Sequence, residues 1–300
     1  MVVRTPPQSF EQFGEVLYPD MAQEPILAKP VRDALTEWLT EIWAAEELEA
    51  VGLKPRQKAL FTGPPGGGKT TLAHHLAARL KLPLVSVRSD RLIDSYIGST
   101  GRNIGALFDL AARSEKVVLF IDEFDSLGLK RRKAQQGAED ERNASVNALL
   151  QRMEQYDGFL IAASNMADAI DEAIWRRFDI QIILALPGQS ERERILARYL
   201  APFKLPLGEM AELAQAFAEA SPALMRQFCE GLKRQLIVGP KVGWEMERDS
   251  VFARLLASVG PHPDLPRPRL WQRGARDPSV AGLTWPLEMP VVPLKRKAAS

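Results

Sequence analysis

The chain has a single cysteine and no long apolar run, and each absence narrows its class. Cys229 cannot form an internal disulfide, and it falls in an apolar helical pattern typical of a small core residue. That cysteine usage fits a reducing compartment. No apolar stretch approaches the roughly 18 residues that a membrane span needs, and the opening residues, MVVRTPPQSF, lack the apolar core of a signal peptide. We expect a cytoplasmic protein without a membrane segment.

An excess of charge of one sign is also lacking. The 39 basic residues are balanced by 38 acidic residues, which leaves a formal net charge of +1. No global field therefore attracts the chain to nucleic acid or to an anionic membrane, and nucleic acid is not the partner that we expect. Apolar residues make up 46% of the 300 residues, which is enough for the core of one or two domains.

Changes in composition divide the chain into four segments. The first is an irregular lead-in over residues 1–25, rich in proline, glutamine and acidic residues, followed by a helical pattern over residues 30–50. A proline-rich stretch that ends in a basic run closes the sequence and predicts an extended tail. The predicted segments are the lead-in and helix (1–56), an α/β domain (57–187), a small all-helical domain (188–258) and the tail (259–300).

Five short apolar runs alternate with helical patterns inside the α/β segment. Runs that are apolar throughout are typical of strands covered by helices on both faces, so we predict a five-stranded parallel sheet. After Pro187 the strand signals stop and helical periodicity takes over, which predicts the all-helical domain. The five runs are residues 59–61, 84–87, 117–121, 159–163 and 180–186.

The segment GPPGGGKT, at residues 63–70, matches the phosphate-binding loop GxxxxGK[ST] at every fixed position. It follows an apolar run and precedes a helical pattern, so its backbone N–H groups and the helix N-terminus would face a phosphate. Lys69 would reach the β- and γ-phosphates, and the Thr70 hydroxyl would bind Mg²⁺. A glycine-rich turn before a helix is the alternative. The predicted nucleotide-binding residues are Gly63, Pro64, Pro65, Gly66, Gly67, Gly68, Lys69, Thr70 and Thr71.

Acidic and amide side chains follow the third and fourth apolar runs. Asp122 and Glu123 come directly after an apolar strand, and ligand sites in open α/β sheets lie at the carboxyl ends of strands. Asp122 would hold Mg²⁺, and Glu123 would orient and polarise a water molecule. Asn165 follows the next run and would fix the same water and sense the γ-phosphate. The alternatives are an acid-capped strand end and an ordinary turn asparagine.

Four motifs in this order, GPPGGGKT, LFIDEFD, AASN and IDEAIWRRFD, resemble the ATPase core of the AAA+ superfamily, and within it the AAA clade, over roughly residues 20–258. The resemblance implies a Mg²⁺-dependent ATPase, with ATP and Mg²⁺ as cofactors and with Lys69, Glu123 and Asn165 in catalytic roles. Gly67 departs from the family, which commonly has threonine or serine there; no ligand is lost.

The resemblance also gives a role to Arg176 and Arg177. In similar proteins, arginines in this segment reach the nucleotide site of a neighbouring subunit, where a planar, permanently charged guanidinium suits the charge on a phosphoryl group. The role implies a homo-oligomeric ring, expected to be a hexamer, and leaves open which arginine leads. The alternative is a pair of arginines that form salt bridges with Asp171 or Glu172.

Two further segments gain a hypothesis from the resemblance. Tyr96 and Ile97 fit the aromatic–aliphatic–glycine triplet that lines the pore of AAA unfoldases and grips a polypeptide; a tyrosine packed on its own helix is the alternative. The polar segment 130–141 is either a second pore loop or a solvated surface loop, and its basic half would suit nucleic acid phosphates.

Arg226 is either a substitute for a second sensor arginine or surface charge.

Three function classes follow. The leading hypothesis is an ATP-driven ring that remodels, unfolds or translocates a protein partner, and some small bacterial AAA proteins similar to this one work beside a separately encoded protease. The second is a nucleic-acid-associated AAA+ switch or loader, against which the near-neutral charge and the Tyr96 triplet count. The third is a scaffold that assembles in response to nucleotide.

Overall fold

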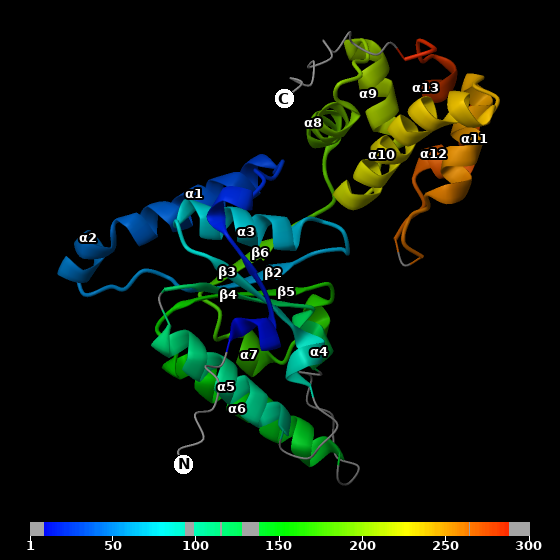
Figure 1. Ribbon diagram of the computed structural model, residues 1–300. Helices are drawn as coiled ribbons and strands as arrows, with labels where there is room; N and C mark the ends of the chain where they lie inside the picture. The colour runs from blue at the N-terminus through cyan, green and yellow to red at the C-terminus, as the bar shows by residue number, and fades with distance from the viewer. Residues whose placement is uncertain (1–8, 94–98, 115, 128–137, 264, 288–300) are drawn as a thin grey trace, which may run out of the picture. The chain divides into compact units, whose positions relative to one another are not determined.

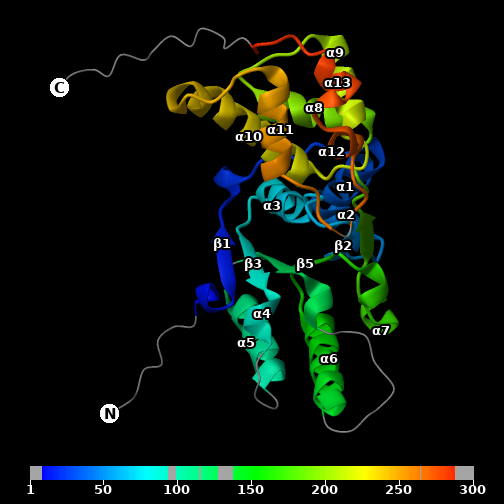
Figure 2. The same ribbon diagram turned by 90° about the vertical axis from the view of Figure 1, so that its right-hand side faces the viewer.

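The computed structural model describes residues 9–93, 99–114, 116–127, 138–263 and 265–287. These residues form two compact units (Figures 1 and 2). The first contains the described residues up to Pro25 together with Lys29–Pro64 and Gly68–Ala185. The second contains Ile26–Ala28, Pro65–Gly67 and the described residues from Leu186 onward.

A six-stranded sheet in the order β1-β3-β4-β5-β2-β6 forms the centre of the first unit. Strands β2 to β6 run parallel to one another, which confirms the predicted parallel α/β fold. Because β3, β4, β5 and β2 are parallel neighbours, their carboxyl ends lie side by side along the same end of the sheet. The residues predicted to bind nucleotide and Mg²⁺ come directly after these strand ends. The five strands are β2 (Lys58–Thr62), β3 (Leu84–Arg88), β4 (Val118–Asp122), β5 (Phe159–Ser164) and β6 (Ile180–Ile183).

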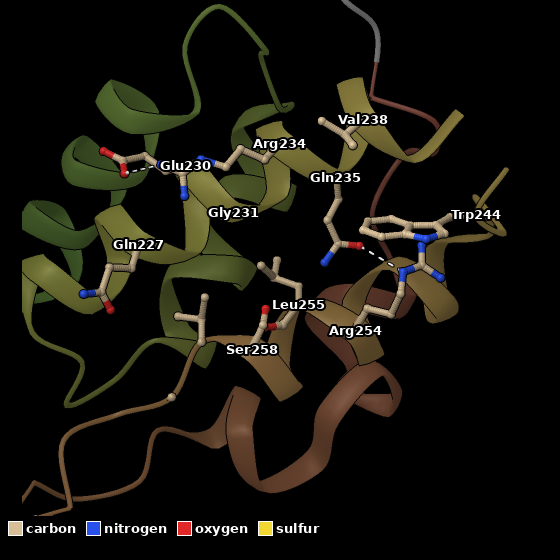
Figure 3. A pocket seen from close by; sticks show the side chains of 12 residues that line it. Gln227, Glu230, Gly231, Arg234, Gln235, Val238, Trp244, Arg254, Leu255 and Ser258 are labelled. Carbon is tan, nitrogen blue, oxygen red and sulfur yellow. Dashed lines mark hydrogen bonds and ion pairs between the residues drawn. The ribbon is translucent and has the colours of Figure 1, made fainter. Parts of the chain in front are cut away.

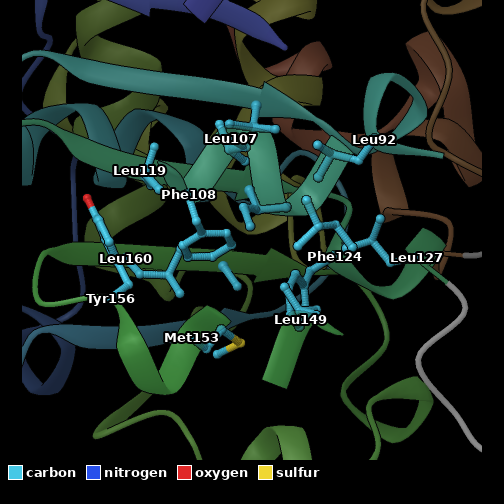
Figure 4. Close-up of a cluster of buried hydrophobic side chains, with 14 of the residues drawn as sticks. Leu92, Leu107, Phe108, Leu119, Phe124, Leu127, Leu149, Met153, Tyr156 and Leu160 are labelled. Carbon is cyan, nitrogen blue, oxygen red and sulfur yellow. The ribbon is translucent and has the colours of Figure 1, made fainter. Parts of the chain in front are cut away.

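Helices cover both faces of this sheet, which explains why its central strands are apolar throughout (Figure 1). One face carries α1 (Lys29–Trp43) and α3 (Lys69–Arg79), and the other carries α5 (Ser99–Arg113) and α6 (Ala138–Gln155). Buried side chains from α5, α6 and the strands pack into one core, labelled in Figure 4: Leu107, Phe108, Leu119, Leu149, Met153 and Leu160. The shorter helices are α2 (Ala45–Ala50), α4 (Ser89–Leu92) and α7 (Glu172–Trp175).

The prediction of an irregular lead-in over residues 1–25 was wrong for its second half. Residues Gly14–Leu17 form strand β1, which pairs antiparallel with β3 at the edge of the sheet. Gly14 permits this pairing, because a Cβ atom there would lie 1.8 Å from the backbone oxygen of Ser86. Phe13 is buried in the core beside the strand. A strand of four residues is too short to show a pattern of its own.

The second unit is entirely helical among its described residues, as predicted. Its principal helices are α8 (Gln189–Leu200), α9 (Leu207–Ala216), α10 (Pro222–Val238) and α11 (Arg248–Ser258). Helix α10 begins with a capping bond from the Leu224 N–H to the Ser221 hydroxyl, and Pro222 stands at its first turn, where a missing N–H costs nothing. Phe217 and Phe228 are edge-to-face at the centre of the core.

The prediction of an extended tail over residues 259–300 was wrong for its described part. Two short helices, α12 (Arg269–Arg273) and α13 (Pro278–Ala281), pack Leu270, Trp271 and Val280 into the core of the second unit. The Trp271 indole donates a hydrogen bond to the backbone oxygen of Val259 at 2.6 Å. Two of the prolines mislead because they begin helices rather than hold an extended chain: Pro268 caps α12, and Pro278 is the first residue of α13.

No helix in the described part of the chain is both long enough and apolar enough to cross a bilayer.

Candidate active site

The predicted phosphate-binding loop connects the end of β2 to the first turn of α3. Gly63 has a φ of +150°, and a Cβ atom there would lie 2.2 Å from the backbone oxygen of Leu184, so only glycine fits. Gly68 caps α3 in the left-handed conformation, with φ of +96°. All nine predicted residues lie in this connection or in the first turn of α3, where N–H groups favour an anion.

Lys69 is buried, with 7% of its surface exposed, and its ammonium uses all three of its protons. Nζ donates to the backbone oxygens of Gly63 at 2.7 Å and Pro64 at 3.0 Å, and to Oδ1 of Asn165 at 2.7 Å. Burial lowers the pKa of Lys69, and the carboxylates of Asp122 and Asp125 oppose that shift. The lysine and the asparagine, far apart in the sequence, therefore form one polar centre.

The two predicted magnesium ligands lie side by side. The Thr70 hydroxyl donates a hydrogen bond to Oδ2 of Asp122 at 2.9 Å, which places two oxygen ligands together at the edge of the sheet. Within the described residues, no cluster of three or more His, Cys, Asp or Glu side chains could hold a metal by itself. That donor set fits Mg²⁺, which binds one or two protein oxygens and completes its shell with phosphates and water.

Glu123 has an unusual backbone. Its φ is +49°, a left-handed conformation that costs a non-glycine residue about 1–3 kcal/mol, and such outliers cluster at functional sites. Its N–H donates to Oδ1 of Asp122 at 2.9 Å, and its carbonyl accepts from the N–H of Ser126 at 2.8 Å. These bonds hold the turn that follows β4.

Two residues that the sequence analysis missed support this turn. The buried Ser89 hydroxyl donates to the backbone oxygens of Asp122 at 2.5 Å and Glu123 at 3.2 Å. Asp125 accepts from the Ser164 hydroxyl at 2.7 Å and from the N–H of Asn165 at 3.2 Å, which orients the asparagine. The signal for Ser89 was its position directly after β3, which pairs with β4 in the register Arg88 to Asp122. The third acid of LFIDEFD was the signal for Asp125.

Arg176 and Arg177 follow α7 and both carry ion pairs. Arg176 pairs with Glu172, which is the alternative that the sequence left open, while Arg177 pairs with Glu154 of α6 at 2.5 Å between Nη2 and Oε1. Asp171 instead caps α7 by accepting from the N–H of Ala173 at 2.8 Å. Each exposed ion pair of this kind stabilises a protein by about 0–1 kcal/mol. Little free energy is therefore needed to separate either guanidinium group from its glutamate.

The structure does not unite the arginines with the phosphate-binding loop. Among the described residues, neither guanidinium has a hydrogen bond or ion pair to Lys69, Thr70 or Asp122. Tyr96, Ile97 and most of the predicted second pore loop lie outside the described residues. Arg226 forms an ion pair with Glu230 at 3.6 Å on the surface of α10.

Comparison with known proteins identifies the domain that carries this site. Residues 59–186, which begin within β2, extend past β6 and include every predicted residue of the hydrolytic site, match the family described as "ATPase family associated with various cellular activities (AAA)". The chain carries an AAA ATPase domain. The resemblance expected from the four motifs is therefore confirmed, and ATP with Mg²⁺ as its usual partner ion is the cofactor pair of this family.

Curated relatives share the AAA domain across part of their length. An uncharacterized AAA family ATPase, y4kL of Sinorhizobium fredii, is 44% identical over 177 residues, which is 58% of this chain and 52% of the relative. The ATP-dependent zinc metalloprotease FtsH of Lachnoclostridium phytofermentans is 36% identical over 56% of this chain and 30% of its own. The chain thus spans about half the length of the first relative and less than a third of the second.

A solved structure agrees with the AAA fold. The FIGL-1 AAA domain matches with a TM-score of 0.65 over 83% of this chain and 87% of its own, at 22% identity.

Proposed function

We propose that this chain hydrolyses ATP to ADP and phosphate with Mg²⁺. The observation that carries the proposal is the polar centre at the carboxyl ends of β4 and β5, where Lys69 bonds Asn165 and Thr70 bonds Asp122. Thr70 and Asp122 would hold the ion, which neutralises phosphate charge when bound. Lys69 would bind the β- and γ-phosphates.

Glu123 and Asn165 take the remaining catalytic roles in this proposal. Glu123 lies one residue beyond the proposed metal ligand Asp122, and it would accept a proton from the attacking water as general base. Asn165 is held on both sides, by Lys69 through its side chain and by Asp125 through its backbone, which suits a residue that positions the same water. The FIGL-1 AAA domain has also been solved in complex with ADP, which supports an adenine nucleotide as ligand.

A Glu123→Gln protein tests the hydrolytic part. The amide keeps the shape of the side chain and cannot accept the proton, so we expect at least a hundredfold loss of phosphate release with ATP binding retained. Lys69→Ala should instead lose nucleotide binding, and chelation of Mg²⁺ should stop hydrolysis in the unaltered protein. Hydrolysis by Glu123→Gln at the normal rate would disprove the assigned roles.

We further propose a homo-oligomeric ring, with six subunits as the expected number, in which Arg176 or Arg177 of one subunit completes the site of the next. The support is that both arginines lie on the surface in weak ion pairs, without a bond to the loop of their own subunit. Mixing two inactive variants tests this. Lys69→Ala subunits keep both arginines, and subunits with both arginines changed to alanine keep an intact nucleotide site. In rings assembled at random from equal amounts, about a quarter of the interfaces should pair an intact site with intact arginines. No recovery of activity would exclude completion between subunits.

We propose a protein, rather than nucleic acid, as the substrate of this motor. The support is that several relatives are FtsH proteins, named ATP-dependent metalloproteases, and that the sequence has the Tyr96–Ile97 triplet. A separately encoded protease would be one partner of such a motor, and the cytoplasm is the proposed compartment.

Tyr96→Ala should keep basal ATP hydrolysis and lose remodelling; a preserved DNA-dependent activity would favour the loader hypothesis. Capture of partners on Glu123→Gln in ATP would identify the substrate.

A further inference from the structure

A groove of about 610 Å³ lies in the second unit, between α10 and α11 (Figure 3). It contains none of the residues that the proposed ATPase uses. Its volume falls within the range of peptide and small-ligand sites. The floor is apolar, formed by Gly231 on α10 and by Leu255 and Val259 at the end of α11.

The apolar lining continues to the surface. Gly231 makes room for it, since a Cβ atom there would lie 2.6 Å from Cδ1 of Leu255. Val238 and Trp244, at the rim, are 42% and 46% exposed. Exposed apolar side chains that form a continuous patch beside a groove mark interaction sites more often than single exposed apolar side chains do.

Gln235 brings an amide donor into this groove. Only 9% of its surface is exposed, and its Oε1 accepts a hydrogen bond from Nε of Arg254 at 3.2 Å. That bond fixes the orientation of the amide, because the oxygen must face the guanidinium. The Nε2 group then points away from Arg254 into the groove (Figure 3), and none of the described residues accepts from it.

Arg254 closes one end of the groove. Its Nη2 donates to the backbone oxygen of Glu245 at 2.7 Å, and its guanidinium stacks 5.3 Å from the centre of the Trp244 ring. In the described part of the chain, its Nη1 carries no hydrogen bond. Figure 3 shows Trp244 and Arg254 together at one end and Gln227 at the other. A guanidinium fixed in this way is organised to bind a carboxylate.

The charges around the groove favour an anion. Arg234 and Arg254 line it, and the single acid in the lining is Glu230. Glu230 forms ion pairs with Arg226 at 3.6 Å and with Arg234 at 3.7 Å, and two arginines against one glutamate leave the lining with a formal charge of +1. An occupant that complements the groove therefore combines an apolar body with a negative group at the Gln235–Arg254 end.

We propose that this groove binds the carboxyl-terminal end of an apolar peptide from a partner protein. The terminal carboxylate accepts from Nε2 of Gln235 and Nη1 of Arg254, and the preceding apolar side chains lie over Gly231 and Leu255. A chain end meets both requirements, because its terminal carboxylate lies directly beside its own preceding apolar side chains. The proposal does not depend on the ATPase roles assigned above.

Fluorescence anisotropy with the full chain tests the proposal. The probe is the fluorescein-labelled peptide Gly-Leu-Ala-Leu-Val with a free carboxyl end. We expect saturable binding that weakens at least tenfold when the same peptide carries a terminal amide. An all-polar peptide, Gly-Ser-Gly-Ser-Gly with a free carboxyl end, should not bind. Equal affinity for the acid and the amide, or for the polar peptide, would overturn the proposal.

A Gln235→Glu variant provides the sharper test. Glutamate keeps the bond to Arg254 but presents an oxygen to the groove in place of the N–H group, so binding of the free-acid peptide should weaken at least tenfold. Gln215→Glu adds the same charge on the surface of α9 and should leave affinity unchanged. Val238→Glu, at an exposed position, should weaken binding at least threefold without a risk to folding.

Unchanged affinity in both groove variants would overturn the proposal. So would a change in the sedimentation of Gln235→Glu relative to Gln215→Glu, because that result would assign the groove to contact between copies of this chain.

Discussion

The hydroxyl of Ser89 donates a hydrogen bond to the backbone oxygen of Asp122, with 2.5 Å between the two oxygens. Ser89 begins α4 directly after β3, and Asp122 ends β4, so the bond joins the carboxyl ends of two neighbouring strands. The same hydroxyl also reaches the backbone oxygen of Glu123, whose left-handed conformation it helps to hold. A residue with no part in the proposed chemistry thus positions the proposed general base.

Ser89→Ala should slow ATP hydrolysis without weakening nucleotide binding. Loss of both hydrogen bonds frees a backbone that is strained by about 1–3 kcal/mol, so Glu123 would leave its position in part of the population. We expect kcat to fall about tenfold and KM to change less than about threefold. Ser114→Ala is the matched control, because that hydroxyl, directly after α5, donates to the backbone oxygen of Leu110 in the last turn of the helix and lies outside the proposed site. A rise in KM with kcat unchanged would contradict the positioning role.

Asn165→Ala should affect catalysis more than binding. The substitution removes an acceptor from Lys69 and the group proposed to position the water, so kcat should fall about 10–100-fold. Affinity for ADP should stay within about threefold, because the loop backbone supplies most phosphate contacts. Met166→Ala, at the exposed next residue, should leave both quantities unchanged. Isothermal titration with ADP and a phosphate-release assay measure the two effects.

Separate substitutions should show which arginine acts between subunits. Alanine in place of the arginine that reaches the neighbouring site should lower kcat by about 10³. Alanine in place of the other arginine should change kcat by less than about threefold. Glu172→Gln and Glu154→Gln remove the ion-pair partners without removing either guanidinium, and we expect activity to be kept in both. Near-normal activity in both alanine variants would leave the finger role without support.

Asp277 should stabilise the second unit in a pH-dependent way. Burial alone would raise its pKa, but hydrogen bonds from Ser279 and the ion pair with Arg269 lower the pKa below the usual range. Because the pKa is lower in the folded state, this stabilisation is present above the unfolded pKa of about 3.9 and is lost as the pH falls through the lower folded value.

Asp277→Asn should therefore lower the free energy of unfolding by about 2–4 kcal/mol at pH 7 and reduce the loss of stability below about pH 4. Urea unfolding followed by tryptophan fluorescence, at pH 7 and at pH 4, measures both effects. The exposed Asp249→Asn is the control. A variant as stable as the parent would show that the packed tail contributes little.

The Cys229 thiol should be inert in the folded protein. Burial raises the pKa of Cys229 to about 12, against about 8.5 for a free thiol, so at pH 9 the thiolate forms only when the chain unfolds. Iodoacetamide at pH 9 should therefore modify Cys229 slowly in buffer and rapidly in urea, as followed by mass spectrometry. Equal rates in the two conditions would show that this part of the core opens readily. The same difference in pKa means that stability falls as the pH rises above about 8.5.

Most of the fold was predictable because its signals are local. The central strands are continuous apolar runs, and the helices of the second unit keep their periodicity, so β2 to β6 and α8 to α11 lie where the sequence placed them. Strand β1 and the packed tail were not predictable. Gly14 allows β1 to approach β3, since a side chain there would meet the backbone of β3. Helices α12 and α13 are held by a few apolar side chains that pack into the core of the second unit, far away in the sequence.

The candidate site shows the same division. A motif dictates the backbone of a loop, so the sequence by itself determined the phosphate-binding loop, the acidic pair Asp122–Glu123 and Asn165 as residues at the ends of strands. Only the tertiary structure decided that Lys69 bonds Asn165, that Asp125 orients this asparagine, that Ser89 holds the turn at Glu123, and that Gln235 bonds Arg254. Each is a contact between residues far apart in the chain, fixed by strand order and helix packing, which no local pattern of residues encodes.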